Sequence, residues 1–327
     1  MDFNRFEQRI SNADRKTPHY DAFIQKNAAK LDNETKKRVK NVYDIFDEAE
    51  VKRLEYQRSL LRKSDIRHIS RLVDGRTGLT LIDIGCNDGG FIKDRVASVG
   101  GVEYALGLDI NNDRIVANVM QNDLNDDPDA PLLVDYACVD AESSDFVDKI
   151  AEIYGGTLIQ FDIVVISMVL LHTSDDMQVL KNAKAVLKDG GKIFIRDMDD
   201  GLTVAYPDKN NVVPQLLEYS LKATAYRHEG RRIPKLLSDC GFRNIGAWVE
   251  SPDTIGANMT QEERDMLCSI NFDYIPIGVK RRADRKERGI TEEDVVKCDK
   301  LMRELRDMFK VKGFFYNMGC MTFTAEK

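Results

Sequence analysis

The sequence predicts an α/β fold in which a doubly wound parallel sheet carries helices on both faces. Short apolar segments, typical of buried strands, alternate with amphipathic segments, typical of helices, through five units between residues 79 and 197. Several of the apolar segments end in an aspartate or in a glycine-rich turn. Because such sheets bind ligands beyond the carboxyl ends of their strands, we expect the functional site at that edge.

Residues 1–75 precede this pattern, and we expect them to be helical. The segment is highly charged, and its apolar residues between Lys40 and Val73 recur at the three- to four-residue spacing of amphipathic helices. The glycines of residues 74–78 indicate a loop before the first strand. This N-terminal extension forms either a cap on the sheet or a dimer arm, and the sequence leaves both alternatives open.

The first five strands are predicted where short apolar runs end in turns: residues 79–84, 104–109, 132–139, 161–168 and 192–197. The helices between them are predicted at residues 90–99, 111–122, 143–154 and 177–187. The pair Gly190-Gly191 is typical of a helix stop and is expected to end the last of these helices.

Beyond the fifth strand, helical segments dominate. Residues 214–240 are predicted to be helical, a sixth strand is expected at 244–250, and a last strand at 314–325. The predicted organisation is a helical extension at 1–75, a core at 76–250, a helical insertion at 251–312 that serves as a lid or dimer interface, and the last core strand at 313–327.

Composition narrows the function. A net charge of −7 over 327 residues disfavours a broad basic face for nucleic acid. No apolar run approaches the roughly 18 residues of a membrane span, and the charged first residues lack an apolar signal core, so we expect a cytoplasmic protein. Six scattered cysteines without a Cys-x-x-Cys pair, and four histidines without close spacing, predict free thiols and no metal.

The turn at residues 85–89 does not fit a dinucleotide site. A pyrophosphate-binding turn needs Gly-x-Gly-x-x-Gly, and here Asn87 stands at the second glycine position. Asp83, just before the turn, would repel a pyrophosphate, whereas its carboxylate suits a ligand ammonium group.

The same residues resemble the glycine-rich motif of class I S-adenosylmethionine-dependent methyltransferases, in which an acid is followed by three glycines at alternate positions. Asp83, Gly85 and Gly89 match, and Asn87 replaces the middle glycine with a residue that tolerates left-handed backbone angles. The resemblance covers about residues 76–250 and 313–327. It implies a seven-strand Rossmann-like sheet ending in an antiparallel pair, with S-adenosylmethionine as methyl donor and S-adenosylhomocysteine as product.

The resemblance also implies roles for individual residues. Asp109, at the end of the second strand, stands where the family holds both ribose hydroxyls, and Asp140 stands where an acid faces the adenine amino group. The segment from Ser167 follows the fourth strand over the methyl-transfer site. The predicted cofactor-binding residues are Asp83, Gly85, Cys86, Asn87, Gly89, Asp109, Ile110, Asp140, Ala141, Ser167 and Met168.

His172 is the leading candidate for a general base, since it lies near the end of the fourth strand, and Asp197 after the fifth strand is a second one. The alternatives are a helix-capping or packing histidine for His172 and binding of an amine substrate for Asp197. Candidates for substrate binding are Asp199, Tyr206, Tyr226, His228 and Arg231, although tyrosines here are more often packing residues and the arginine more often solvated.

The preferred function is O- or N-methylation of a small molecule, because the two helical additions would close the pocket and exclude water. The segment Ser167–Leu170 lacks the Pro-Pro-Tyr motif of adenine-methylating enzymes, and no Pro-Cys nucleophile marks a cytosine enzyme. Alternatives are an RNA or protein methyltransferase, which an exposed basic patch around Arg281 would support, a non-catalytic S-adenosylmethionine-binding module, and a nucleotide-dependent oxidoreductase. A homodimer through the helical additions is a further expectation, and no membrane or nucleic-acid partner is expected.

Overall fold

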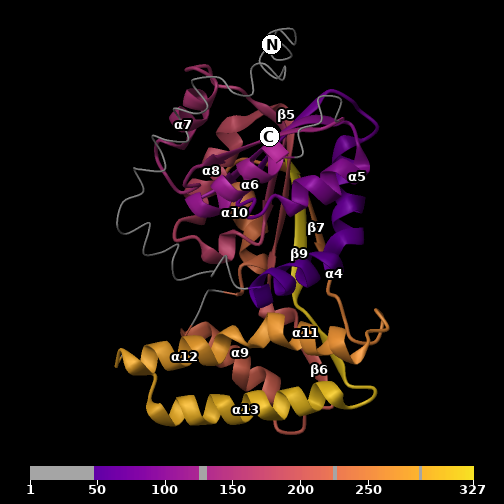
Figure 1. Ribbon diagram of the computed structural model, residues 1–327, viewed down its shortest axis with the longest axis vertical. Coiled ribbons are helices and arrows are strands. Elements are labelled where there is room, and N and C mark those ends of the chain that lie inside the picture. Colours follow the sequence, from indigo (N-terminus) through magenta and orange to yellow (C-terminus); the bar gives the residue numbers. More distant parts are fainter. Residues whose placement is uncertain (1–47, 125–130, 224–226, 287–288) are drawn as a thin grey trace.

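The computed structural model describes residues 48–124, 131–223, 227–286 and 289–327. A seven-stranded sheet of order β3-β2-β1-β4-β5-β9-β7 lies at its centre (Figure 1). The first five strands pair in parallel and the last two pairings are antiparallel, so the predicted Rossmann-like sheet is confirmed. The strands are β1 (Leu79–Ile84), β2 (Val102–Asp109), β3 (Leu133–Cys138), β4 (Phe161–Ser167), β5 (Leu187–Met198), β7 (Arg243–Val249) and β9 (Cys320–Glu326).

Helices cover both faces of this sheet, because successive side chains of a strand point to opposite faces and both sets are apolar. In β1, Ile82 and Ile84 pack with α7 (Phe146–Ile153), α8 (Asp176–Val186) and α10 (Ile233–Asp239). Leu79 and Leu81 pack instead with α4 (Glu48–Val73) and the π-helix η1 (Phe91–Val96), which continues into α5 (Ala97–Val99). A further helix, α6 (Asn112–Leu124), packs beside β3 and β2.

A second helical layer lies below the carboxyl edge of the sheet (Figure 1). It consists of α9 (Val212–Ala223), α11 (Gln261–Phe272), α12 (Tyr274–Asp284) and α13 (Glu292–Lys310). Capping boxes begin two of these helices, at Thr260 and Thr291. One apolar cluster joins the layer to Leu61 of α4 and to Leu171 and Met198 of the sheet edge. The helical insertion before the last strand is therefore present, and it lies against the edge where the site was expected.

Three predicted boundaries were wrong. The helix expected over 214–240 is divided into α9, which ends at Ala223, and α10, which begins at Ile233, and residues 227–232 are not α-helical. The fifth strand begins at Leu187 and not at residue 192, directly after α8 ends at Val186, so the pair Gly190-Gly191 does not stop the helix. The glycines lie inside β5, where pairing with β4 shifts from Leu187 to Lys192 and accommodates extra residues as a bulge.

The predicted last strand is divided in two. Its first part, β8 (Phe315–Asn317), pairs with the short β6 (Val204–Tyr206), which the sequence analysis missed. The chain then turns at Gly319, where an added Cβ would lie 2.1 Å from the Asp199 carbonyl oxygen, and enters the main sheet as β9. Three short helical turns complete the described structure: η2 (Leu170–His172), η3 (Asp200–Leu202) and η4 (Gly230–Arg232).

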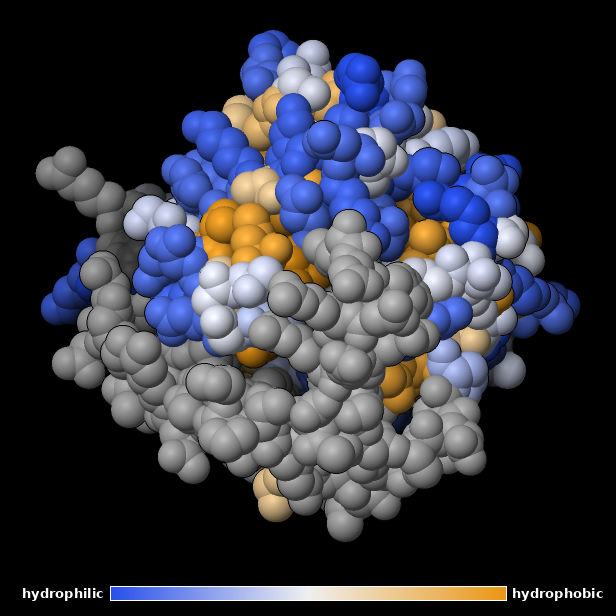
Figure 2. Space-filling view, turned by 90° about the horizontal axis from the view of Figure 1, so that it is seen from above, coloured by the Kyte–Doolittle hydropathy of each residue, from blue (hydrophilic) through white to orange (hydrophobic). Residues whose placement is uncertain are grey.

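Among the described residues, no helix combines the length and apolar character needed to cross a membrane. Figure 2 views the molecule from the end opposite the helical layer, where hydrophilic residues cover much of the coloured surface and hydrophobic residues appear in smaller patches. Residues 1–47 of the predicted extension lie outside the described residues, and α4 is the part of it that can be assessed.

Candidate active site

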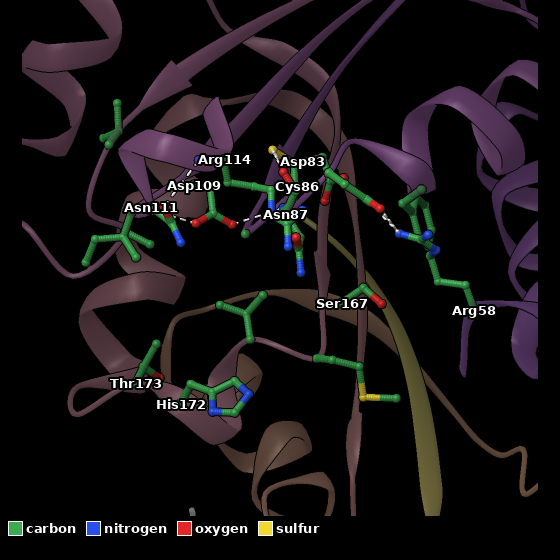
Figure 3. Close-up of a pocket in the computed structure, with 18 of the residues that line it drawn as sticks. Arg58, Asp83, Cys86, Asn87, Asp109, Asn111, Arg114, Ser167, His172 and Thr173 are labelled. Carbon is green, nitrogen blue, oxygen red and sulfur yellow. Dashed lines mark hydrogen bonds and ion pairs between the residues drawn. The ribbon is translucent and has the colours of Figure 1, made fainter. Parts of the chain in front are cut away.

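A pocket of about 260 Å³ opens beyond the carboxyl ends of β1, β2, β3 and β4, at the predicted edge (Figure 3). Ten of the eleven predicted cofactor-binding residues line it: Asp83, Gly85, Cys86, Asn87, Asp109, Ile110, Asp140, Ala141, Ser167 and Met168. Gly89 is the exception. The tertiary structure thus brings together side chains that stand up to 85 residues apart in the sequence, from Asp83 to Met168.

The turn after β1 has left-handed backbone angles at three alternate residues, with φ of 79° at Gly85, 51° at Asn87 and 72° at Gly89. Asn87 adopts the angle that the sequence analysis expected of it. An added Cβ at Gly85 would lie 2.4 Å from Val169 Cγ2, and one at Gly89 would lie 2.2 Å from Tyr136 Oη. Gly89 therefore allows the turn to pack on the Tyr136 side chain. Gly89 faces Tyr136 and is not among the residues that line the pocket.

The Asp109 carboxylate is fixed by its own neighbourhood (Figure 3). Its Oδ2 accepts the Asn87 N–H at 2.9 Å, and its Oδ1 accepts the Asn111 N–H at 2.8 Å. Burial raises the pKa of Asp109, and these two hydrogen bonds oppose that rise. Each oxygen retains a lone pair for a ligand hydroxyl. Asp140, just after β3, accepts the Glu142 N–H at 3.0 Å.

Asp83 has a different environment. It is 1% exposed, and its Oδ2 is buried without a hydrogen-bond partner. Burial, reinforced by the Asp109 and Asp88 carboxylates and only partly offset by Arg95, raises the pKa of Asp83 to about 8. A buried polar atom without a hydrogen-bond partner costs free energy, so this oxygen is suited to accept a hydrogen bond from a donor group of a ligand.

The two predicted base candidates lie in different places. His172 lines the pocket from η2, next to Thr173 (Figure 3). Asp197 is fully buried behind that turn and does not line the pocket. Its carboxylate accepts the Leu171 N–H at 3.2 Å and the Met198 N–H at 2.8 Å, and burial raises its pKa to about 7. Asp197 thus contacts the backbone of the turn that carries His172.

The predicted substrate-binding residues are not among the pocket residues. Asp199 is buried and pairs with Arg231, whose Nη2 lies 2.6 Å from Asp199 Oδ1. Burial alone would raise the pKa of Asp199, but the Arg231 guanidinium holds it below the usual value. His228 forms a β-bridge with Asp199, and Tyr206 is 73% exposed on β6. Tyr226 lies outside the described residues.

Sequence reasoning missed the wall that α4 contributes. Gln57, Arg58, Leu61 and Asp65 line the pocket, and Arg58 forms an ion pair with Asp88 of the turn (Figure 3). The spacing of these residues places them on one face of a helix, but it does not reveal what that face covers. The other lining residues that were missed are Asp88, Phe91, Arg95, Asn111, Arg114, Val139, Glu142, Val169 and Thr173. Within the described part of the chain, no group of three or more potential ligands is arranged for a metal ion.

Comparison with known proteins finds a match for the part of the chain that supplies most of the pocket residues. Residues 82–193 match the methyltransferase domain family. Ubiquinone biosynthesis O-methyltransferases from several strains of Coxiella burnetii are 29% identical over 117 residues, which is 36% of this chain and 42% of those proteins. The match therefore spans less than half the length of these relatives.

Some solved structures also resemble this chain at low identity. A phosphoethanolamine N-methyltransferase 2 of Haemonchus contortus, in complex with phosphomonomethylethanolamine and S-adenosylhomocysteine, is 17% identical, with 81% of this chain and 52% of that chain covered and a TM-score of 0.47. A cyclopropane synthase of Mycobacterium tuberculosis is 14% identical, with 81% and 84% covered and a TM-score of 0.46.

Proposed function

Since residues 82–193 are a methyltransferase domain, we propose that this chain is a class I S-adenosylmethionine-dependent methyltransferase that acts on an oxygen or nitrogen of a small molecule. The observation that carries the proposal is the placement of two carboxylates in one pocket. Asp83 offers a buried oxygen without a partner, and Asp109 offers a carboxylate fixed by two backbone N–H groups. The first suits a ligand ammonium group and the second a pair of ribose hydroxyls.

The remaining pocket residues fit the same ligand. Asp140, next to Ala141, follows β3 and would accept from the adenine amino group, and Ser167 and Met168, at the end of β4, would lie near the methyl-transfer centre. S-adenosylmethionine, when bound, supplies an electrophilic methyl group on a sulfonium ion. The protein's main contribution is alignment of the acceptor atom with that methyl group, because positioning alone supplies much of the acceleration in such displacements.

His172 is the pocket residue suited to take a proton from a hydroxyl or ammonium acceptor. Asp197 supports it indirectly, since its carboxylate holds the Leu171 N–H of the turn that carries His172. The exposed Arg231 guanidinium neutralises the buried Asp199 carboxylate, and we assign this pair to the stability of the sheet edge instead of to substrate binding.

Two features support a small acceptor. The helix α4 contributes one wall of the pocket, and the helical layer packs below the same edge of the sheet. A pocket walled in this way suits a small acceptor better than a macromolecular chain. We therefore assign α4 as a cap on the pocket in preference to a dimer arm. A homodimer through the exposed faces of the helical layer remains a prediction, and sedimentation analysis of the purified chain would test it.

One observation favours a second candidate function. Lys280 and Arg281 are exposed near the end of α12, where a basic surface would contact RNA or an acidic protein. The neighbouring Asp284 reduces the local positive charge, so we rank an RNA or protein acceptor below a small molecule.

The function is tested by measuring S-adenosylhomocysteine release from the purified full chain and S-adenosylmethionine. Three separate mixtures supply the acceptors: a metabolite extract filtered below about 1 kDa, total RNA, and total protein. We expect release with the metabolite fraction alone, and none for Asp109→Ala. Release with RNA or protein only would favour the second candidate. Binding of S-adenosylmethionine without release in any mixture would favour a non-catalytic module, and absence of binding would refute the cofactor assignment.

A further inference from the structure

The helix α4 contributes to the pocket although it precedes the matched domain at residues 82–193. Arg58 of α4 pairs with Asp88, and it lies on the opposite side of the pocket from Asp109, Asn111 and Arg114 (Figure 3). We therefore expect α4 to contact the part of a bound ligand that lies away from Asp109.

Asp65 fixes the position of α4 on the core. It is 3% exposed, and its two carboxylate oxygens accept from two different arginines: Oδ2 from Arg95 Nε at 3.1 Å, and Oδ1 from Arg196 Nη1. Arg95 belongs to η1 and is 3% exposed, and Arg196 belongs to β5 and is fully buried. Asp65 thus contacts two buried guanidinium groups, which share it with one further carboxylate each, Asp94 for Arg95 and Glu250 for Arg196. Removing a buried partner from such a set is far more disruptive than removing an exposed charge.

The same network of contacts includes a second residue of α4, one helical turn beyond Asp65. Arg196 Nη2 also donates to Glu250 Oε2 at 2.9 Å, and Glu250 Oε1 lies 2.9 Å from His68 Nε2. Asp65 and His68 are three residues apart, so they share one face of the helix. These polar contacts therefore hold the same face of α4 at two points, to η1 and β5 at Asp65 and to Glu250, just after β7, at His68.

This network places two positively charged side chains at the pocket, those of Arg58 and Arg95. Arg95 lines the pocket and donates to the carbonyl oxygen of Arg58, and Arg58 itself lines the pocket and pairs with Asp88. Together with Asp83, these groups present both charge signs at one end of the pocket. An α-amino acid group carries an ammonium and a carboxylate, and it needs both signs from its site.

We propose that Asp65 is a positioning residue of the methyl-donor site, which holds α4 so that Arg58 and Arg95 face the amino-acid end of the ligand. The inference rests on the proposed function, because it concerns the same ligand. It extends the site to residues that lie outside the matched domain. Asp65 acts through Arg58 and Arg95. Its substitution should therefore weaken only the binding of ligands that possess an amino-acid end.

The experiment compares two ligands on Asp65→Asn by calorimetry. S-adenosylhomocysteine carries the amino-acid group, and 5′-methylthioadenosine lacks it while keeping the adenosine that Asp109 and Asp140 contact. We expect the affinity for S-adenosylhomocysteine to fall about tenfold or more, as for loss of a charged hydrogen bond, and the affinity for 5′-methylthioadenosine to stay within about twofold.

The single tryptophan of the chain reports the seating of α4 independently of any ligand. Trp248 packs against His68, with ring centroids 4.6 Å apart, and under Arg71, whose guanidinium carbon is 5.9 Å from the ring centroid. Both partners belong to α4. In Asp65→Asn, we expect acrylamide to quench the Trp248 fluorescence more efficiently than in the wild type.

Arg62→Gln is the matched control. The Arg62–Asp94 ion pair joins the same two elements, α4 and η1, but both side chains are exposed. Exposed pairs contribute little, so this variant should keep both affinities and the quenching of the wild type.

Wild-type affinity of Asp65→Asn for S-adenosylhomocysteine, or an equal loss for both ligands in a folded protein, overturns the proposal. If Asp65→Asn does not fold, Arg58→Gln decides: we expect the same selective loss, and unchanged S-adenosylhomocysteine affinity overturns the proposal. If the wild type binds neither ligand, the proposed function itself fails. Normal binding by the wild type and by both Asp65→Asn and Arg58→Gln would overturn only the role of Asp65.

Discussion

Asp83→Asn should stabilise the free protein while weakening its binding of the methyl donor. The Asp83 carboxyl is almost completely buried, its Oδ2 has no hydrogen-bond partner, and two other carboxylates lie near enough to raise its pKa. Asparagine has nearly the same shape and carries no charge. The substitution therefore removes the cost of a buried anion and, with it, the acceptor for a ligand ammonium group.

The size and pH dependence of the stabilisation follow from the pKa of Asp83. Burial raises this pKa from 3.8 to about 8, so the folded state binds the proton more tightly than the unfolded chain. The stability that protonated Asp83 contributes is present below about pH 4 and is lost as the pH rises toward 8. The full loss is at most about 6 kcal/mol. Because water entry reduces the cost of ionisation, we expect Asp83→Asn to gain about 1–3 kcal/mol at pH 8.5 and nothing near pH 4.

Urea unfolding of wild type and variant between pH 4 and 8.5 measures this gain. Calorimetry at pH 7 with S-adenosylhomocysteine, in buffers of different ionisation enthalpy, measures the second effect. A bound ammonium favours ionised Asp83, so the wild type should release protons on binding and the variant should release fewer and bind at least about tenfold more weakly. Asp88→Asn is the control, because the Arg58 ion pair outweighs burial and holds the pKa of Asp88 below its usual value, and its loss should not stabilise the protein at any pH.

Three results would refute this reasoning. A destabilised Asp83→Asn at pH 8.5, or a gain that does not change with pH, would mean that the buried charge is not the source of the effect. Unchanged affinity for S-adenosylhomocysteine would remove Asp83 from the ammonium site.

The remaining predictions concern the turn, the ribose site and the base. Asp109→Ala should lower S-adenosylhomocysteine affinity about a hundredfold, since ribose hydroxyls and two backbone N–H groups lose a charged acceptor; an unchanged affinity contradicts the assignment. Gly89→Ala should lower the melting temperature more than Gly190→Ala. Both glycines have φ of 72°, but only Gly89 would also bring its Cβ against Tyr136, so equal losses would argue against the clash. His172→Ala should reduce turnover at unchanged cofactor affinity, and normal turnover would exclude His172 as the base.

Much of the fold and of the donor site could be predicted because the signals are local. A buried strand followed by a tight turn is encoded in neighbouring residues, so β1 and the turn at Gly85–Gly89 were placed correctly. Asp109 was predictable for a related reason: parallel strands end at the same edge, so an acid after any of them enters the same site.

The wrong boundaries arose where tertiary contacts override a local signal. Gly190-Gly191 has the composition of a helix stop, but pairing of β5 with β4 extends the strand back to Leu187 and absorbs the glycines in a bulge. The division of the last strand depends on Gly319 passing close to the Asp199 backbone, 120 positions earlier in the chain, and nothing in the residues around Gly319 indicates that approach.

The sequence by itself determined the sheet, the glycine turn and the acids at the strand ends, because each depends on periodicity or on residues that are neighbours in the chain. Only the tertiary structure decided which charges meet. It paired Asp199 with Arg231, placed Asp197 behind the pocket, left Asp83 Oδ2 without a hydrogen-bond partner and joined Asp65 to Arg196. The pKa and the role of a carboxylate depend on burial and on opposite charges within a few ångströms, and these neighbours come from residues as far apart as 131 positions in the chain.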